Sequence, residues 1–197
     1  MRLPYTPNPP PASSEEDKAI IERIAARRAP RPLQPLDLTL LHAPAVADGW
    51  NGFLGAVRTR TSLEAGAREL AICRVAVVNR AWYEWGHHAP LASSAGVTDA
   101  GLEVAKRPVL GDADWADAES AGLSPTEWAV LRYADEMTRN VQVPDQVFAL
   151  LRAVCSEREV VEVTATVAAY NCVSRFLVAL DVGERNGTGP DYVAPGH

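Results

Sequence analysis

Cysteine is scarce in this sequence, and its few cysteines are far apart. Cys73, Cys155 and Cys172 are an odd number without close spacing, which argues against a disulfide framework and against a Cys-x-x-Cys redox pair. Cys73 and Cys172 lie within apolar runs, so we expect both to be buried as small hydrophobic residues.

Positive charge is also limited. The 19 Lys and Arg residues are outnumbered by 25 Asp and Glu, which gives a formal net charge of -6. Binding to phosphates needs a clustered basic face, and the basic residues here are scattered. We therefore expect no nucleic-acid partner, and we interpret the Arg- and Pro-containing stretch 28–35 as a solvated connector.

Uninterrupted hydrophobic runs are missing. Residues 1–17 contain no apolar segment of the kind found in secretory signals. The longest nearly apolar run, 160–180, is interrupted by Glu162, Asn171 and Arg175, which favours a buried helix over a membrane span. We expect a cytoplasmic protein without a membrane partner.

Apolar residues recur at three- and four-residue steps along most of the chain, which is typical of amphipathic helices. Serine caps and prolines punctuate this pattern; Ser124, Pro125 and Glu127 form the clearest capping box. The fold class predicted is all-α. The expected helices cover residues 13–28, 44–59, 62–79, 81–94, 98–108, 124–140, 143–155 and 156–183, with loop or broken structure over 109–123.

The chain divides by composition into three parts. Residues 1–36 form a proline-rich N-terminal arm with a short helix, residues 37–183 form one helical domain, and residues 184–197 form a loose C-terminal tail. In the helix that begins near Pro44 we expect a buried face made by Val46, Trp50, Phe53, Leu54 and Val57.

The decapeptide 81–90, AWYEWGHHAP, concentrates polar chemistry beside indole surface. Glu84 and His88 are four residues apart and share one helix face, so the carboxylate can orient the imidazole for proton transfer. Trp82 and Trp85 could shield this pair from water. The alternative interpretation is a surface Glu–His contact with tryptophans in the core.

A metal site ranks below acid–base chemistry in this segment. Two histidines and two carboxylates are suitable ligands. However, the adjacent His87 and His88 diverge on a helix, and no HxxxH or HExxH spacing is present. We therefore expect no metal.

The stretch RELAICRVAVVNRAWYEWGHHAPLASSAGVT, residues 68–98, resembles the carboxymuconolactone decarboxylase and AhpD-like superfamily of small, oligomerising, all-helical proteins. The resemblance covers most of residues 38–182. Peroxidases of this family carry a glutamate, a Cys-x-x-Cys pair and a histidine. The same register here reads Glu69, Ala81, Glu84 and His88, so both thiols are missing. The YEWGHH motif instead resembles the decarboxylase-like branch.

This resemblance implies a lyase or isomerase without a cofactor, acting on a small lactone or carbonyl acid. His88 is the expected proton donor, Glu84 its orienting partner and Glu69 a second carboxylate in the pocket. The remaining candidates are substrate-binding residues. His87 could substitute for His88. Tyr83, Trp82 and Trp85 are expected to form the cavity walls, and Arg74 is expected to pair with Glu69 or with a substrate carboxylate.

Two other functions stay open at this point. One is a thiol peroxidase or oxidoreductase that uses the scattered cysteines, which the missing dithiol disfavours. The other is a non-catalytic oligomer that binds a small molecule. The resemblance implies a homo-oligomer, a trimer or a hexamer, in each case.

Overall fold

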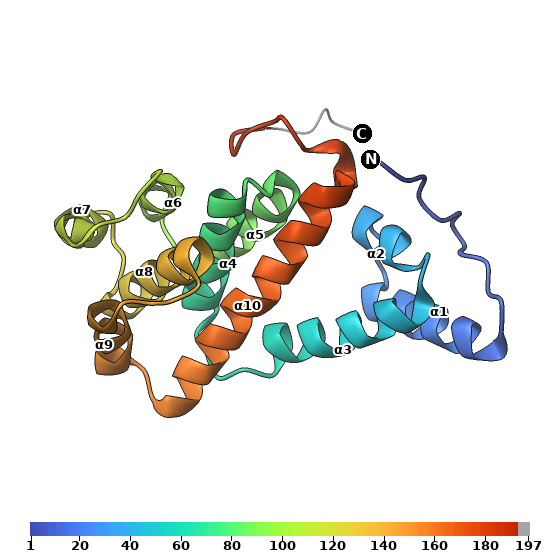
Figure 1. Ribbon diagram of the computed structural model, residues 1–197, viewed down its shortest axis with the longest axis horizontal. Coiled ribbons are helices and arrows are strands. Elements are labelled where there is room, and N and C mark those ends of the chain that lie inside the picture. Colours follow the sequence, from blue (N-terminus) through green and yellow to red (C-terminus); the bar gives the residue numbers. More distant parts are fainter. Residues whose placement is uncertain (193–197) are drawn as a thin grey trace.

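The computed structural model describes residues 1–192 and contains only helices and connecting segments within that range. The predicted all-α fold class is confirmed (Figure 1). The helices are α1 (Glu15–Arg28), α2 (Pro35–Leu40), α3 (Pro44–Thr59), α4 (Ala65–Asn79), α5 (Trp82–Ser94), α6 (Asp99–Lys106), η1 (Asp112–Asp114), α7 (Trp115–Ser120), α8 (Pro125–Asn140), α9 (Asp145–Val154), α10 (Glu157–Leu180) and η2 (Val182–Glu184).

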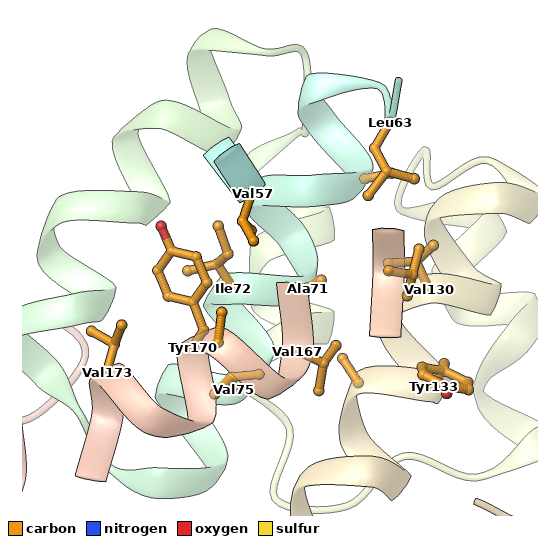
Figure 2. Packing of buried hydrophobic residues seen from close by; sticks show 14 of the residues in the cluster. Val57, Leu63, Ala71, Ile72, Val75, Val130, Tyr133, Val167, Tyr170 and Val173 are labelled. Carbon is orange, nitrogen blue, oxygen red and sulfur yellow. The ribbon is translucent and has the colours of Figure 1, made fainter. Parts of the chain in front are cut away.

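The helix α4 is the centre of the packing, because it contacts α5, α6, α8 and α10. Its apolar residues Leu70, Ile72 and Val75 are fully buried, as expected for a helix that is apolar on every side. Figure 2 shows side chains of α4, α8 and α10 meeting in this core. Polar side chains on α4 are therefore also held inside the protein.

A sharp turn connects α4 to α5 and sets the geometry of the site. Arg80 adopts a left-handed conformation (φ 54°) after the last turn of α4, and α5 returns along α4. Residues on the facing sides of the two helices can therefore meet across this hairpin. Glu69 of α4 and His88 of α5 are such a pair.

Local signals fixed several helix ends as predicted. The Ser124 hydroxyl accepts from the Glu127 amide at 3.2 Å, while the Glu127 carboxylate accepts from the Ser124 amide at 2.8 Å. This capping box begins α8. By contrast, Ser62 does not cap α4; it donates to Glu162 of α10 instead.

The N-terminal helices pack against the rest of the chain. α1 and α2 both contact α3, and the predicted boundary between residues 36 and 37 falls inside α2. Residues 109–123, expected to be loop or broken structure, contain η1 and α7. Of the predicted loose tail, residues 193–197 lie outside the described part of the chain.

One expectation about apolar residues is corrected. Val46 and Phe53 of α3 are not buried; their relative exposures are 57% and 50%. By length and composition alone, α10 is also a helix that could cross a membrane, a criterion that the core helix of a folded protein meets as well. In this fold Val163 and Val167 of α10 are buried in the core with α4 and α8.

Candidate functional site

A small cavity lies between the N-terminal helices and the helices α3, α5 and α10. Its volume is about 150 Å³. α5 contributes Tyr83, Glu84, His87 and His88, and α10 contributes Tyr170. The structure therefore brings most of the residues predicted from the motif to one enclosed space.

The partner of His88 is Glu69. The Nδ1 atom of His88 lies 2.6 Å from Oε2 of Glu69, and both side chains are buried. The expectation that Glu84 orients His88 is wrong, although the two share helix α5. Glu69 orients His88 across the α4–α5 hairpin. The Tyr170 ring packs edge-on against the His88 ring, with 4.9 Å between the two ring centroids.

Burial and hydrogen bonding set the charge of this pair. Burial lowers the pKa of His88, and the contact with Glu69 opposes this shift without overcoming it. Burial is the largest single influence on Glu69 and acts to raise its pKa, but the hydrogen bond and charge of His88, together with the charges of Arg58 and Arg68, outweigh burial and lower the Glu69 pKa. Near neutral pH the pair is an ionised carboxylate and a neutral imidazole. Nδ1 carries the proton that is donated to Glu69, which leaves the lone pair on Nε2 free.

Glu84 has a different environment. It is buried, and its Oε1 accepts a hydrogen bond of 2.9 Å from the Ser174 hydroxyl. Its Oε2 has no hydrogen-bond partner within the described residues. Burial raises the pKa of Glu84 well above its ordinary value, so this carboxyl group holds its proton. A neutral acid, Glu84, and a neutral base, His88, therefore line the same cavity. Two groups whose pKa values are shifted in opposite directions are typical of acid–base sites.

Arginines gather on the N-terminal side of the cavity. Arg28 forms a two-point ion pair with Asp37 at 2.7 and 2.9 Å. Arg27, Arg31 and Arg58 also line the cavity, and none forms an ion pair with another residue in the range 1–192. These guanidinium groups can bind an anion such as a carboxylate. The connector expected over 28–35 is thus part of the cavity wall.

Tyr83 and His87 form the boundary between this cavity and a second one. Their rings lie 4.3 Å apart between centroids, and the His87 Nδ1–H donates to the Tyr83 carbonyl at 2.8 Å. Burial raises the pKa of Tyr83 to about 12, so its hydroxyl keeps its proton. His87 is exposed and has no contact with either glutamate.

The tryptophans do not enclose His88 as expected. Trp85 is buried in a core cluster around α4 and α6, with Trp82 packed against it. Both line the second cavity, of about 300 Å³, which lies against residues 185–192. The aromatic side chain that does pack against His88 is Tyr170 of α10.

Arg74 does not line the cavity; it forms a buried ion pair with Asp135 of α8. Its guanidinium is completely buried and donates to Asp135 at 2.6 and 2.9 Å. It also donates to the carbonyls of Ala105 and Arg107. Both expected roles, pairing with Glu69 and binding substrate, are therefore wrong.

Neither a cluster of metal ligands nor an ionised thiol accompanies the Glu69–His88 pair within residues 1–192. Residues 1–192 contain no group of three or more His, Cys, Asp or Glu side chains placed to hold a metal ion. Cys73 is buried, as predicted, and burial raises its thiol pKa well above the ordinary value. Cys172 is exposed, contrary to expectation.

Sequence reasoning missed several residues of the site. Tyr170 and Ser174 of α10 were not among the expected site residues. Arg58 and Asn51 of α3 also line the cavity. No local pattern marks these positions, since helix packing alone brings them near His88.

A family model matches the central part of the chain. The model of the carboxymuconolactone decarboxylase family matches residues 44–136, which include Glu69, Glu84 and His88. This match and the helical fold support the resemblance to the carboxymuconolactone decarboxylase and AhpD-like superfamily that the sequence indicated. No curated protein matches the chain.

Solved structures with the same fold include three informative examples. An AhpD-core, peroxidase-related protein from Ralstonia eutropha is 16% identical, with 96% of each chain covered and a TM-score of 0.71. A peroxidase-related protein from Silicibacter is 14% identical over 95% of this chain and 92% of that one, with a TM-score of 0.67.

The third example is the debrominase Bmp8, in a cysteine-to-alanine variant bound to 2,3,4-tribromopyrrole. It is 17% identical over 92% of this chain and 91% of that one, with a TM-score of 0.68. At these identities the similarity establishes the fold.

Proposed function

We propose that this protein is an acid–base enzyme without a cofactor, a lyase or isomerase that acts on a small carbonyl acid such as a lactone. One observation carries the proposal. His88 is held through Nδ1 by the Glu69 carboxylate inside a small cavity. This arrangement leaves Nε2 of a neutral imidazole available to take a proton from a substrate.

The chemistry follows from the protonation states. Nε2 of His88 removes a proton from a carbon beside the substrate carbonyl, and the electrons of the broken C–H bond move to the carbonyl oxygen. The protonated Glu84 donates a hydrogen bond or its proton to that oxygen, while Glu69 stabilises the imidazolium that forms. Return of the proton to another carbon gives an isomer. In a decarboxylating lyase, the bond between the substrate carbon and its carboxylate breaks, CO2 leaves, and the electrons of that bond move to the same oxygen.

This assignment changes the first role of His88. The sequence suggested a proton donor, whereas a lowered pKa favours a base. The raised pKa of Glu84 favours this residue as the donor. The two roles are complementary, because the imidazolium produced in the first step returns its proton later.

The cavity also favours a class of substrate. Its volume of about 150 Å³ suits a small molecule, and Arg27, Arg31 and Arg58 favour a carboxylate on it. A carbonyl acid places its charge near these arginines and its reactive carbon near His88. This class agrees with the family description, which names a carboxylated lactone.

Thiol chemistry is the competing function, because two of the similar structures are peroxidase-related. Ala81 and Glu84 occupy the positions at which that branch has its cysteines. Cys73 is buried and its raised pKa disfavours the reactive thiolate. These features favour acid–base chemistry over a dithiol mechanism.

The test uses exchange of carbon-bound hydrogen. Unsaturated lactones and keto acids are incubated with the protein in D2O, and deuterium incorporation and products are followed by NMR. We expect His88→Gln to slow turnover by about 10²- to 10⁴-fold, the usual contribution of a general acid or base. His42→Gln is the matched control, because His42 is exposed and bonds to the Pro4 carbonyl outside the cavity.

Two outcomes would contradict the proposal. If His88→Gln turns over substrates as fast as the wild type, His88 does not transfer the proton. If a compound raises the melting temperature but undergoes neither exchange nor conversion, the non-catalytic binding function is supported instead.

A further inference from the structure

Asn51 of α3 lines the cavity and carries a polar atom that the described chain leaves unpaired. Its Nδ2 donates to the Ala47 carbonyl at 2.8 Å, which fixes the orientation of the amide. Its Oδ1 is buried and has no hydrogen-bond partner within residues 1–192. Buried polar groups are normally paired, and an amide oxygen accepts hydrogen bonds but donates none. A hydrogen-bond donor from outside the chain therefore suits this position.

Other polar groups of the cavity wall supply donors and positive charge. Glu84 holds its proton, so its unpaired Oε2 can donate to a ligand. Arg27 and Arg58 are cations, and the Asp37 carboxylate already accepts from Arg28 at 2.7 and 2.9 Å. Donors and cations recognise the oxygen atoms of a carbonyl acid. The Asn51 oxygen instead recognises a donor on the same ligand.

The cavity wall on α3 changes in character along the helix. Asn51, Leu54 and Arg58 all line the cavity, and their three- and four-residue steps place them on one helix face. Seven residues span two turns, or about 10 Å along the axis. The Arg58 charge acts at the reactive pair, because it lowers the pKa of both His88 and Glu69. A carboxylate bound at Arg58 leaves Asn51 to a group farther along the ligand, beyond the apolar Leu54.

We propose that the substrate carries a hydroxyl or N–H group remote from its carboxylate, and that Oδ1 of Asn51 accepts a hydrogen bond from this group. The inference rests on the proposed function, since it assigns a further part of the same carbonyl acid. An acid without the donor leaves Oδ1 buried and unpaired, and a site built for a hydrogen bond discriminates strongly against such an analogue. Asn51 is thus a specificity-determining residue that takes no part in proton transfer.

The test compares the binding of simple acids by calorimetry. 4-Hydroxybenzoate, 4-fluorobenzoate and benzoate share a carboxylate and an apolar centre, but only the first has a donor at the far end. 5-Hydroxypentanoate and pentanoate repeat the comparison on a flexible chain. We expect the full-length wild type to bind each hydroxy acid about 10- to 100-fold more tightly than its analogues.

Asn51→Leu removes the acceptor and keeps a side chain of similar size, so it should bind each hydroxy acid and its analogues with nearly equal affinity. Asn51→Ala is a second variant with the same expected result, and alanine favours the helix. Asn140→Ala is the matched control, because Asn140 is exposed at the end of α8 and donates to Glu136. It should keep the preference of the wild type. Circular dichroism verifies the helix content of each variant.

Four results would overturn this inference. They are equal binding of hydroxy acid and analogue by the wild type, as expected if water satisfies Asn51, failure of both hydroxy acids to bind, a preference that persists in both Asn51 variants, and equal loss of preference in Asn140→Ala. Binding needs no turnover, so the outcome is separate from the deuterium exchange assigned to His88. Exchange without a hydroxyl preference overturns this inference alone, whereas a preference without exchange overturns the acid–base function alone.

Discussion

Glu69 and His88 are 19 positions apart in the chain, yet their side chains meet at 2.6 Å in a buried hydrogen bond. The α4–α5 hairpin brings them together. Because the Glu69 carboxylate accepts a hydrogen bond from the Nδ1–H group of His88, it fixes the tautomer of the ring and leaves Nε2 as the basic atom. This one contact determines which atom of His88 can take part in chemistry.

The tautomer of His88 is therefore a direct prediction. At neutral pH we expect a neutral ring with the proton on Nδ1, whereas free imidazole side chains usually carry it on Nε2. Nitrogen-15 NMR correlated with the ring protons distinguishes the two forms. We expect Glu69→Gln to change the pattern for His88 and to leave that for the exposed His42 unchanged. A proton on Nε2 in the wild type would contradict the proposed role of His88 as a base.

The pH dependence of turnover should follow both buried groups. Activity should rise as His88 loses its proton, at a pH below its ordinary value of 6.5 because burial lowers its pKa. Activity should fall again at higher pH, where Glu84 loses its proton at its raised pKa. In Glu84→Gln the fall at high pH should disappear, since an amide does not ionise. The profile of kcat/KM for each variant provides the measurement.

Glu84 should also make stability depend on pH. Its folded-state pKa is raised, so above about 4.5 the unfolded chain loses this proton while the folded chain keeps it. The free energy of unfolding contributed by Glu84 therefore falls as pH rises through that window, by up to about 1.4 kcal/mol per pH unit. Urea denaturation at several pH values should show a smaller fall for Glu84→Gln. Parallel curves for the two proteins would show that Glu84 is ionised in the folded state.

Two arginines should respond differently to substitution by methionine. Arg74→Met leaves the Asp135 carboxylate buried with only Arg139 beside it, and we expect a loss of about 3 kcal/mol in unfolding free energy. Arg58→Met removes a cation without an ion pair in the described chain, so its effect should stay within about 0.5 kcal/mol. Calorimetry of carboxylate binding should show weakening for Arg58→Met. Equal destabilisation by the two changes would contradict this division of roles.

The cysteines should differ in their accessibility. Only Cys172 is exposed, so titration of the native protein with a thiol reagent should modify one cysteine rapidly and all three after unfolding. Cys172→Ser should remove the rapid reaction and preserve acid–base turnover. If the loss of this thiol abolishes turnover, the oxidoreductase function is supported in place of the lyase or isomerase.

The sequence by itself predicted most of the helices and the family resemblance. Helix periodicity and caps are local properties, because they depend on residues three or four positions apart, and the Ser124–Glu127 box began α8 as predicted. The YEWGHH motif likewise identified Glu84, His88 and their neighbourhood. No helix was expected at α2 or α7, since each has only 6 residues and few local signals.

Only the tertiary structure decided which groups act together. Glu84 is nearer to His88 along the helix, but packing buries its carboxyl group beside Ser174 of α10 and gives His88 to Glu69. Arg74 and the tryptophans looked equally suitable for the cavity and were placed elsewhere. The physical reason is that contact and ionisation depend on burial, and burial at each position is the summed effect of segments far apart in the chain.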